Sequence, residues 1–158
     1  VGTAVGFSAI LMAEYDPVGC EIITIENYEK RIPIARENFI RAEKEEQITL
    51  LEGDAKDVLE TLTEPFDLIF MDAAKGQYLN FLPRVLELLQ PEGILISDNV
   101  LQDGDIIESR FAVTRRNRTI HKRMREYLYT LTHSEELTTA VLPVGDGITI
   151  STKKGRKA

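Results

Sequence analysis

The chain has 158 residues, of which 43% are hydrophobic, and its net charge is −7, which allows one globular domain with a sizeable core. No apolar run reaches the roughly 18 residues that a membrane helix needs, and no signal peptide is recognisable, so we expect a cytoplasmic protein with no membrane partner. Cys20 is the single cysteine, which excludes a disulfide framework and a cysteine-based metal site.

The chain opens on Val1, Gly2 and Thr3, which we interpret as the last residue of a strand and its exit turn. A glycine loop with no strand behind it has nothing to anchor it. We therefore expect the strand that leads into this turn, and whatever precedes that strand, to be missing. A genuine start at Val1 is the alternative.

Apolar, strand-like runs then alternate with helical patterns. The expected elements are a helix over 7–15, a strand over 21–25, a helix capped by Asn27 with Pro33 in its first turns, strands over 48–51 and 66–71, a helix over 78–89 stopped by Pro91 and Gly93, and a strand over 94–97. Buried strands separated by helices are typical of a parallel sheet with helices on both faces.

The C-terminal part follows a different pattern. A long basic helical region is expected over about 105–132, with His121 and His133 on its surface. Strands over 137–142 and 148–152 are joined by five residues, too few for a crossover helix, so this pair must be antiparallel. The whole pattern resembles an α/β, Rossmann-like class I methyltransferase fold, a mainly parallel sheet closed by an antiparallel hairpin. We predict one domain over 1–154 and a basic tail over 155–158.

Basic residues are concentrated in two places, the stretch 110–125, which holds no acid, and the C-terminal tail. The stretch 110–125 and residues 153–157 together hold eleven of the 19 Lys and Arg residues, whereas the rest of the chain holds all 26 acids. A basic stripe on an acidic body favours a polyanionic partner. A solvated helix face and a disordered tail are the alternative.

Ligands of such a sheet bind outside the carboxyl ends of its strands, where three features favour an adenosine-bearing cofactor. The turn from Gly2 to Ser8 lets backbone approach a ligand, although any tight strand-to-helix turn uses glycine. Glu26, at a strand end, can accept hydrogen bonds from both ribose hydroxyls or be a solvated side chain. Asp54 and Ala55 follow the next strand, where an adenine would lie.

Asp72 closes one expected strand, and Asp98 and Asn99 close the next. One helix separates the two strands, so a right-handed crossover places both ends on the same edge of the sheet. Two carboxylates and an amide oxygen suit a magnesium ion. The alternative is that Asp72 caps the next turn and Asp98 binds loop amides. Lys75, three residues after Asp72, is a general base, a group that orients an alkoxide, or a surface lysine.

Several of these segments resemble the metal-dependent O-methyltransferases, the family of the catechol and caffeoyl-CoA enzymes. The segments are VGTAVGFS (1–8), MDAAK (71–75), SDNV (97–100) and LPVGDG (142–147). The resemblance implies a seven-stranded fold with Lys75 and Asp72 as catalytic residues. It also implies Mg²⁺, or a similar divalent cation, on Asp72, Asp98 and Asn99. S-adenosylmethionine would be bound by residues at the strand ends, namely Gly2, Thr3, Gly6, Ser8, Glu26, Asp54, Ala55 and Asp72.

The family's acid just before Val1 and its N-terminal helices are absent, which leaves open whether the chain by itself is active. DAAKGQY (72–78), DNVL (98–101) and ISTKK (150–154) resemble, more closely, the bacterial members that methylate tRNA 5-hydroxyuridine at the wobble position. This implies that the anticodon region of tRNA contacts Arg115, Arg116, Arg118 and Lys122. A homodimer is also expected. The alternatives are a catechol-type enzyme acting on a small hydroxylated aromatic, a nicotinamide oxidoreductase, and a non-catalytic RNA-binding module.

Overall fold

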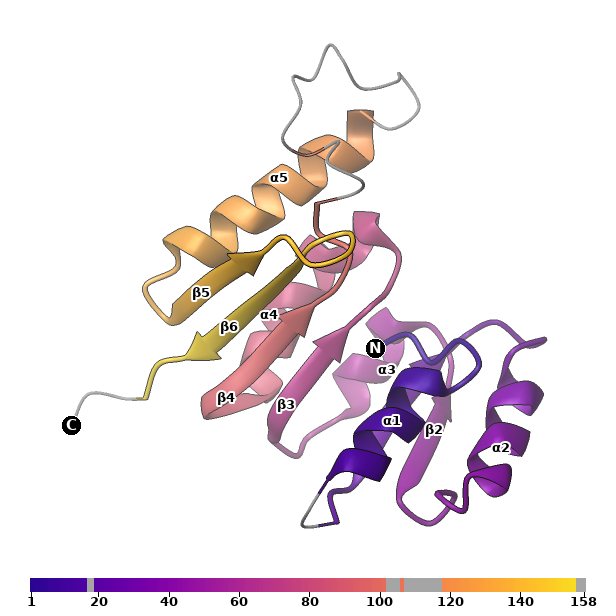
Figure 1. Cartoon of the computed structure of the whole chain (residues 1–158). Coiled ribbons are helices and arrows are strands. Elements are labelled where there is room, and N and C mark those ends of the chain that lie inside the picture. Colours follow the sequence, from indigo (N-terminus) through magenta and orange to yellow (C-terminus); the bar gives the residue numbers. More distant parts are fainter. Residues whose placement is uncertain (17–18, 102–105, 107–117, 156–158) are drawn as a thin grey trace. The chain divides into compact units, whose positions relative to one another are not determined.

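The computed structural model describes residues 1–16, 19–101, 106 and 118–155. The chain forms two compact units, Val1–Thr61 and Leu62–Ala158, shown in Figure 1. A single domain over 1–154 stays a prediction.

The first unit packs three helices with two parallel strands. β1 pairs with β2 in register from Ile22 opposite Ile48 to Glu26 opposite Glu52. The elements are α1 (Phe7–Tyr15), β1 (Ile22–Glu26), α2 (Ile32–Arg41), β2 (Ile48–Glu52) and α3 (Ala55–Thr61). Their shared core is made of small and apolar side chains, namely Ala9, Ala13, Ile32, Ala35, Phe39, Ile48 and Leu50.

The start of α2 differs from the prediction that Asn27 caps it. The helix begins five residues later, at Ile32, with Pro33 in its first turn as expected. The Glu26 carboxylate instead accepts hydrogen bonds from the backbone N–H groups of Asn27 and Tyr28. A short turn, closed by the Arg31 N–H on the Tyr28 carbonyl, then leads into the helix. A buried acid therefore organises the chain after β1, so the predicted cap is wrong.

Gly6 is required by its backbone and by its surroundings. It lies just before α1 at φ 92°, and a Cβ there would lie 2.5 Å from the Phe39 ring. Phe39 belongs to the core of the first unit, so its ring cannot move without disturbing that core.

Replacing Gly6 with Ala should therefore destabilise the protein by more than the free-energy cost of holding an alanine backbone at a positive φ. Gly19 is the matched control, because it has φ 79° and a Cβ added there would meet no atom within 4 Å. We expect Gly6→Ala to lose about 1–3 kcal/mol more free energy of unfolding than Gly19→Ala, as measured in urea. Equal losses for the two variants would show that the Phe39 contact is irrelevant.

The second unit is a four-stranded mixed sheet in the order β3-β4-β6-β5. β3 and β4 are parallel, whereas β6 is antiparallel to both β4 and β5. The Rossmann-like pattern with an antiparallel C-terminal hairpin is thus confirmed. The elements are β3 (Phe66–Met71), η1 (Lys75–Gln77), α4 (Tyr78–Leu88), β4 (Leu89–Ser97), α5 (Arg118–His133), β5 (Leu137–Leu142) and β6 (Ile148–Lys153).

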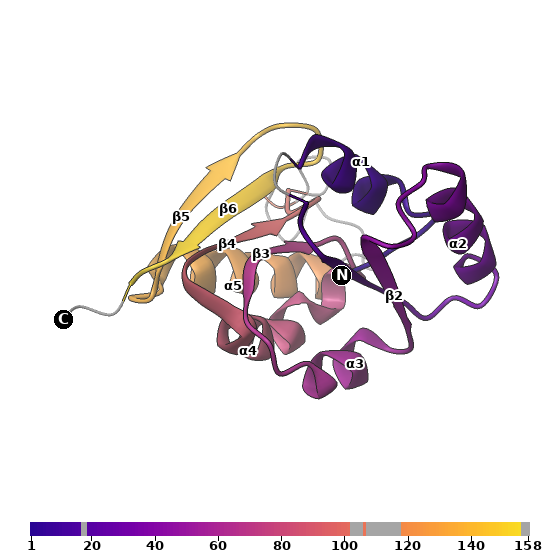
Figure 2. The ribbon, with the colours of Figure 1, turned by 90° about the horizontal axis from the view of Figure 1, so that it is seen from below.

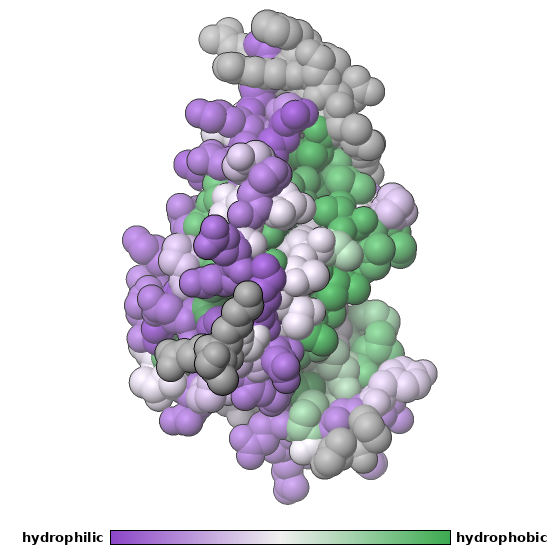
Figure 3. Space-filling model, turned by 90° about the vertical axis from the view of Figure 1, so that its left-hand side faces the viewer, coloured by the Kyte–Doolittle hydropathy of each residue, from purple (hydrophilic) through white to green (hydrophobic). Residues whose placement is uncertain are grey.

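Both long helices of this unit cover one face of its sheet, as Figure 2 shows for α4 and α5. The buried side chains Met71, Leu95 and Ser97 lie on that side. Strand alternation sends Leu68 and Ile94 to the opposite face, where Leu68 is 43% exposed. Figure 3 shows hydrophobic side chains along one side of the surface and hydrophilic ones along the other. No helix among the described residues is long and apolar enough to cross a membrane.

The basic helical region expected over about 105–132 is described from Arg118 onward as α5, and residues 107–117 lie outside the described part. His121 is buried, so its predicted place on the helix surface is wrong. It precedes Met124 and Tyr127 by three and six residues and therefore shares their buried face. His133 is exposed as expected and stacks on Tyr129 with ring centroids 3.9 Å apart.

Candidate active site at the ends of β3 and β4

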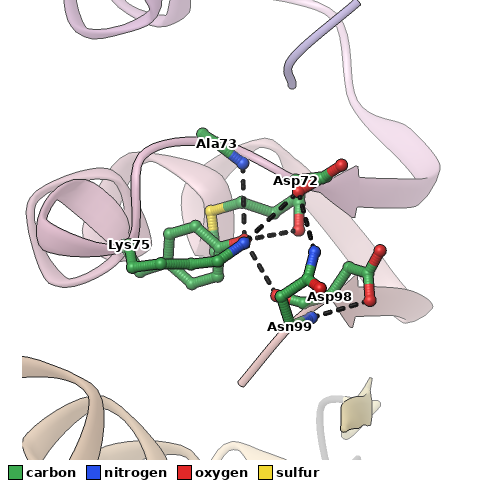
Figure 4. A network of polar contacts seen from close by, with 7 residues as sticks. Asp72, Ala73, Lys75, Asp98 and Asn99 are labelled. Carbon is green, nitrogen blue, oxygen red and sulfur yellow. Dashed lines mark hydrogen bonds and ion pairs between the residues drawn. The ribbon is translucent and has the colours of Figure 1, made fainter. Parts of the chain in front are cut away.

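The ends of two neighbouring parallel strands bring Asp72 and Asp98 together. Met71 pairs with Ser97 at the last rung of the β3–β4 ladder, and the Asp98 N–H donates to the Met71 carbonyl at 3.0 Å. Asp72 and Asp98 therefore follow directly after two adjacent strands, and they lie on the same edge of the sheet, as predicted. Figure 4 shows both side chains at this edge together with Lys75 and Asn99.

Asn99 has a left-handed backbone, with φ 55°, a conformation that Asn tolerates better than most residues. Its N–H donates to Asp98 Oδ1 at 2.7 Å. The nitrogen and oxygen of its side-chain amide can be assigned in two ways. In one, Nδ2 donates to Asp72 Oδ1 at 3.3 Å. In the other, the nitrogen donates to Asp146 Oδ2 at 3.0 Å and the oxygen accepts from Lys75 Nζ at 3.2 Å.

The β5–β6 hairpin loop holds the chain just after Asn99. The N–H groups of Val100 and Leu101 donate to the carbonyls of Gly147 and Asp146, at 2.9 and 2.8 Å. Gly147 has φ 82°, and a Cβ there would lie 2.3 Å from the Leu101 side chain. Any other residue at 147 would push this loop away. The predicted hairpin thus helps to fix one wall of the site.

Lys75 opens the short helix η1, and its ammonium group lies 3.4 Å from Asp72 Oδ1. It also lies 5.5 Å from the centre of the Tyr78 ring. Both partners of the ion pair remain partly exposed. Lys75 is therefore neither a remote surface lysine nor a buried one, and its amine is open to a ligand at Asp72.

The oxygen atoms of Asp72, Asp98 and Asn99 fit a hard divalent cation. Within residues 1–16, 19–101, 106 and 118–155, no three His, Cys, Asp and Glu side chains form a metal-binding group. The cluster proposed from the sequence has two acids and one amide, so it does not depend on a third acid. The Lys75 ammonium already lies 3.4 Å from Asp72 Oδ1, so a cation bound there would share this carboxylate with a positive charge.

Two residues of this site had no assigned role in the sequence analysis. The Tyr78 hydroxyl lies against the backbone of both strand ends, although the helical pattern identified Tyr78 only as the start of α4. Asp146 approaches Asn99 from the hairpin, and its place in the LPVGDG segment was the one available signal. Burial raises the pKa of the Tyr78 hydroxyl well above its ordinary value, so this group stays protonated at neutral pH and can donate a hydrogen bond.

The candidate cofactor residues of the first unit are organised around its opening turn. The N–H groups of Gly2 and Thr3 both donate to the Ile25 carbonyl. The Thr3 hydroxyl is buried and bonds to the Thr24 hydroxyl at 2.7 Å, so only the Thr3 backbone is placed to meet a ligand. Ser8 is exposed in the first turn of α1.

Glu26 is buried rather than solvated. Besides the N–H groups of Asn27 and Tyr28, its carboxylate accepts the Ala4 N–H at 2.8 Å. A carboxylate has about four acceptor directions, so about one remains for a ligand while this turn is closed. Hydrogen bonds to both ribose hydroxyls, as expected from the sequence, would require the Ala4 contact to open.

Asp54 and Ala55 lie where α3 begins. Asp54 Oδ1 accepts the Lys56 N–H at 2.9 Å, and the Asp54 carbonyl accepts from Asp57 and Val58. Asp54 therefore caps the helix. Its side chain is exposed and Ala55 is half-buried, so both remain reachable by a ligand.

The candidate RNA-binding residues are only partly described, because Arg115 and Arg116 lie outside the described residues. Arg118 and Lys122 lie in the first turns of α5, where Lys122 is exposed. This helix packs against η1, and Arg123 Nη1 donates to the Gly76 carbonyl at 2.7 Å. The described part of the basic stripe therefore adjoins the loop that carries Lys75.

Comparison with known proteins agrees with this fold. A model of the O-methyltransferase family matches residues 1–154. A catechol O-methyltransferase of Niastella koreensis is 36% identical over 112 residues, which cover 68% of this chain and 51% of the relative. Caffeoyl-CoA O-methyltransferase 1 of Eucalyptus globulus is 31% identical over 160 residues, with coverages of 95% and 63%. The SAH-bound methyltransferase of Podospora anserina has a TM-score of 0.86 at 30% identity, with coverages of 98% and 70%.

The chain belongs to the O-methyltransferase family. It spans about half to two thirds of the length of these curated relatives. The predicted family resemblance is thus confirmed, and the nicotinamide oxidoreductase is disfavoured. None of the three relatives is named for a tRNA substrate, so the closer resemblance to tRNA-modifying members gains no support from them.

Proposed function

We propose that this protein methylates a hydroxyl of a small, catechol-type aromatic, with S-adenosylmethionine as the methyl donor and Mg²⁺ as the metal. One observation carries the proposal. In a chain of the O-methyltransferase family, the ends of β3 and β4 bring an amine, Lys75 Nζ, to 3.4 Å from Asp72, beside Asp98 and Asn99. The alternative substrate of the sequence analysis is favoured here because the curated relatives are named for catechol and caffeoyl-CoA.

The residues of the second unit have complementary roles in this proposal. Asp72, Asp98 and Asn99 would hold the cation through side-chain oxygens. Bound Mg²⁺ would supply positive charge that favours the ionised form of a substrate hydroxyl. Lys75 Nζ, in its neutral amine form, would accept that hydroxyl proton, because it reaches the same carboxylate that would hold the cation. The ionised substrate oxygen would then form a bond to the methyl carbon as the carbon–sulfur bond breaks.

The residues of the first unit would bind the cofactor. Backbone at Gly2, Thr3 and Gly6 would approach it, with Ser8 contributing its exposed hydroxyl. Glu26 would accept a ribose hydroxyl, and Asp54 and Ala55 would contact the adenine. Asp72 was also predicted to contact the cofactor. A cytoplasmic location and a homodimer belong to the same proposal.

The test is methyl transfer from radiolabelled S-adenosylmethionine by the full-length protein with Mg²⁺, to a panel of catechols and to bulk tRNA in parallel. We expect label in the catechols. Label in tRNA alone would replace the small-molecule substrate with the second candidate below. Label in neither, with the cofactor bound, would overturn methyl transfer to both substrate classes.

A second candidate substrate is 5-hydroxyuridine of tRNA, which the position of α5 favours. Arg118 and Lys122 lie on the helix that packs against the Lys75 loop. Lysine and arginine at such a place can bind phosphates and position RNA without reading its sequence.

If tRNA binds there, the double variant Arg118→Ala, Lys122→Ala should weaken tRNA binding and lower its salt dependence. Each lost phosphate contact removes released counterions, so the log–log slope should fall by about one per contact. Lys154→Ala is the matched control, because it follows β6 at the opposite end of the sheet from Asp98. Binding measured by fluorescence anisotropy at several salt concentrations decides this. An unchanged slope in the double variant would exclude this surface.

A further inference from the structure

Tyr78 lies at the centre of the candidate site although its side chain has no exposed surface. It is the first residue of α4 and follows η1 directly. Its hydroxyl lies 3.1 Å from the Met71 carbonyl oxygen and 3.0 Å from that of Asp98. The Ala73 N–H approaches the same hydroxyl at 3.4 Å. Figure 4 shows Asp72, Ala73 and Asp98 close together at the ends of the two strands.

The two carbonyls belong to the positions that place the candidate metal ligands. Met71 is the last residue of β3 and precedes Asp72, while Asp98 is the first residue after β4. A hydroxyl has one proton, so the two carbonyls share it. The Met71 carbonyl also accepts the Asp98 N–H. Without the hydroxyl, the Asp98 carbonyl would lose this partner.

The ring of Tyr78 is itself held in place. It packs edge-to-face on Tyr127, with centroids 5.3 Å apart and an interplanar angle of 74°. The Lys75 ammonium also lies 5.5 Å from the ring centre. One rigid side chain therefore contacts the backbone of both strand ends and the candidate base.

We propose that Tyr78 is a positioning residue, whose hydroxyl sets the spacing between the Asp72 and Asp98 backbones and hence the geometry of the cation site. The cation part of this inference rests on the proposed function. The spacing part rests on the hydrogen bonds alone. Removing the hydroxyl as Tyr78→Phe keeps the ring, its packing on Tyr127 and its contact with Lys75.

Tyr127 provides a matched control. It is also fully buried, and it belongs to the same aromatic pair. Its hydroxyl bonds to the Ser97 side chain at 2.6 Å, whereas that of Tyr78 bonds to main-chain carbonyls. Tyr127→Phe therefore removes an equally buried hydroxyl from the same core while leaving the Tyr78 contacts with the two strand ends in place.

The experiment compares the full-length protein with Tyr78→Phe and Tyr127→Phe by two measurements. Mn²⁺ affinity is measured by electron paramagnetic resonance of the free ion, and backbone mobility by hydrogen–deuterium exchange of peptides over 71–77 and 97–101. Groups that orient metal ligands typically affect affinity by about 10- to 100-fold. We expect Tyr78→Phe to weaken Mn²⁺ binding at least about tenfold and to speed exchange in both peptides. Tyr127→Phe should stay close to wild type in both measurements.

The outcomes separate the two claims. Equal Mn²⁺ affinity and equal exchange in the two variants would overturn the role of Tyr78. If the wild-type protein does not bind Mn²⁺, the metal part of the proposed function fails, and exchange alone decides the role of Tyr78. Faster exchange confined to Tyr78→Phe would then support the spacing role, and equal exchange in both variants would overturn it.

Discussion

Replacing Lys75 with Ala should lower kcat for methyl transfer by about 100- to 10,000-fold, the usual contribution of a positioned general base. The structure places its amine 3.4 Å from Asp72 Oδ1, at the edge where the substrate hydroxyl would bind. S-adenosylmethionine affinity should change little, because Lys75 would act on the substrate oxygen. Single-turnover transfer to a catechol and cofactor binding by calorimetry measure the two effects separately.

Two controls sharpen the Lys75 prediction. Lys154→Ala removes a lysine from the opposite end of the same sheet, where Lys154 Nζ donates to the Glu135 carbonyl, and should leave kcat unchanged. Lys75→Arg keeps the positive charge but replaces the amine with a group that does not deprotonate, so it should be nearly as slow as Lys75→Ala. A Lys75→Ala variant with wild-type turnover would rule out Lys75 as the base, and a fast Lys75→Arg would assign it an electrostatic role.

Replacing Asp72 with Asn should abolish tight cation binding and, with it, most methyl transfer. The substitution keeps the size of the side chain but removes the charge at the carboxylate that Lys75 contacts. We expect the Kd for Mn²⁺ to rise by more than about tenfold, because even groups that only orient metal ligands affect affinity by that factor. Calorimetric titration of the full-length protein gives this value.

Asp67→Asn is the control for the Asp72 prediction. Asp67 lies on the same strand, β3, but near its other end, where it is exposed and accepts a hydrogen bond from Gln90. The two variants make the same chemical change and differ in position. If both bind Mn²⁺ like the wild type, Asp72 has only a structural role, and the metal site proposed at the ends of β3 and β4 is wrong.

Much of the fold could be predicted because strong local patterns determine it. The bounds of α1, β3 and β5 agree with the sequence prediction, since each apolar run ends at a turn signal or a change of period. The placement of Asp72 and Asp98 on one edge of the sheet followed from topology. Two consecutive parallel strands joined by one right-handed crossover must end on the same edge, and the β3–β4 pairing confirms this.

The features that were predicted wrongly or not at all have a common physical origin, because each depends on contacts that local sequence patterns do not reveal. Asn27 has a good capping side chain, but the Glu26 carboxylate binds the turn instead. His121 looked polar and exposed, yet it falls on the buried face of α5. The Tyr78 hydroxyl reaches the Asp98 carbonyl, 20 residues away, only after β3 and β4 have paired. Periodicity assigns a residue to a face, but it does not say what a buried hydroxyl meets there.

The most direct test of the account is methyl transfer by the full-length protein after removal of divalent cations. The protein is treated with excess EDTA, passed through a desalting column, and assayed with labelled S-adenosylmethionine and a catechol before and after Mg²⁺ is added back. With Asp72, Asp98 and Asn99 holding the metal, transfer should fall to background in chelator and return with Mg²⁺. Full transfer in the continued presence of excess EDTA would contradict the account, because the cluster at the ends of β3 and β4 would then need no cation.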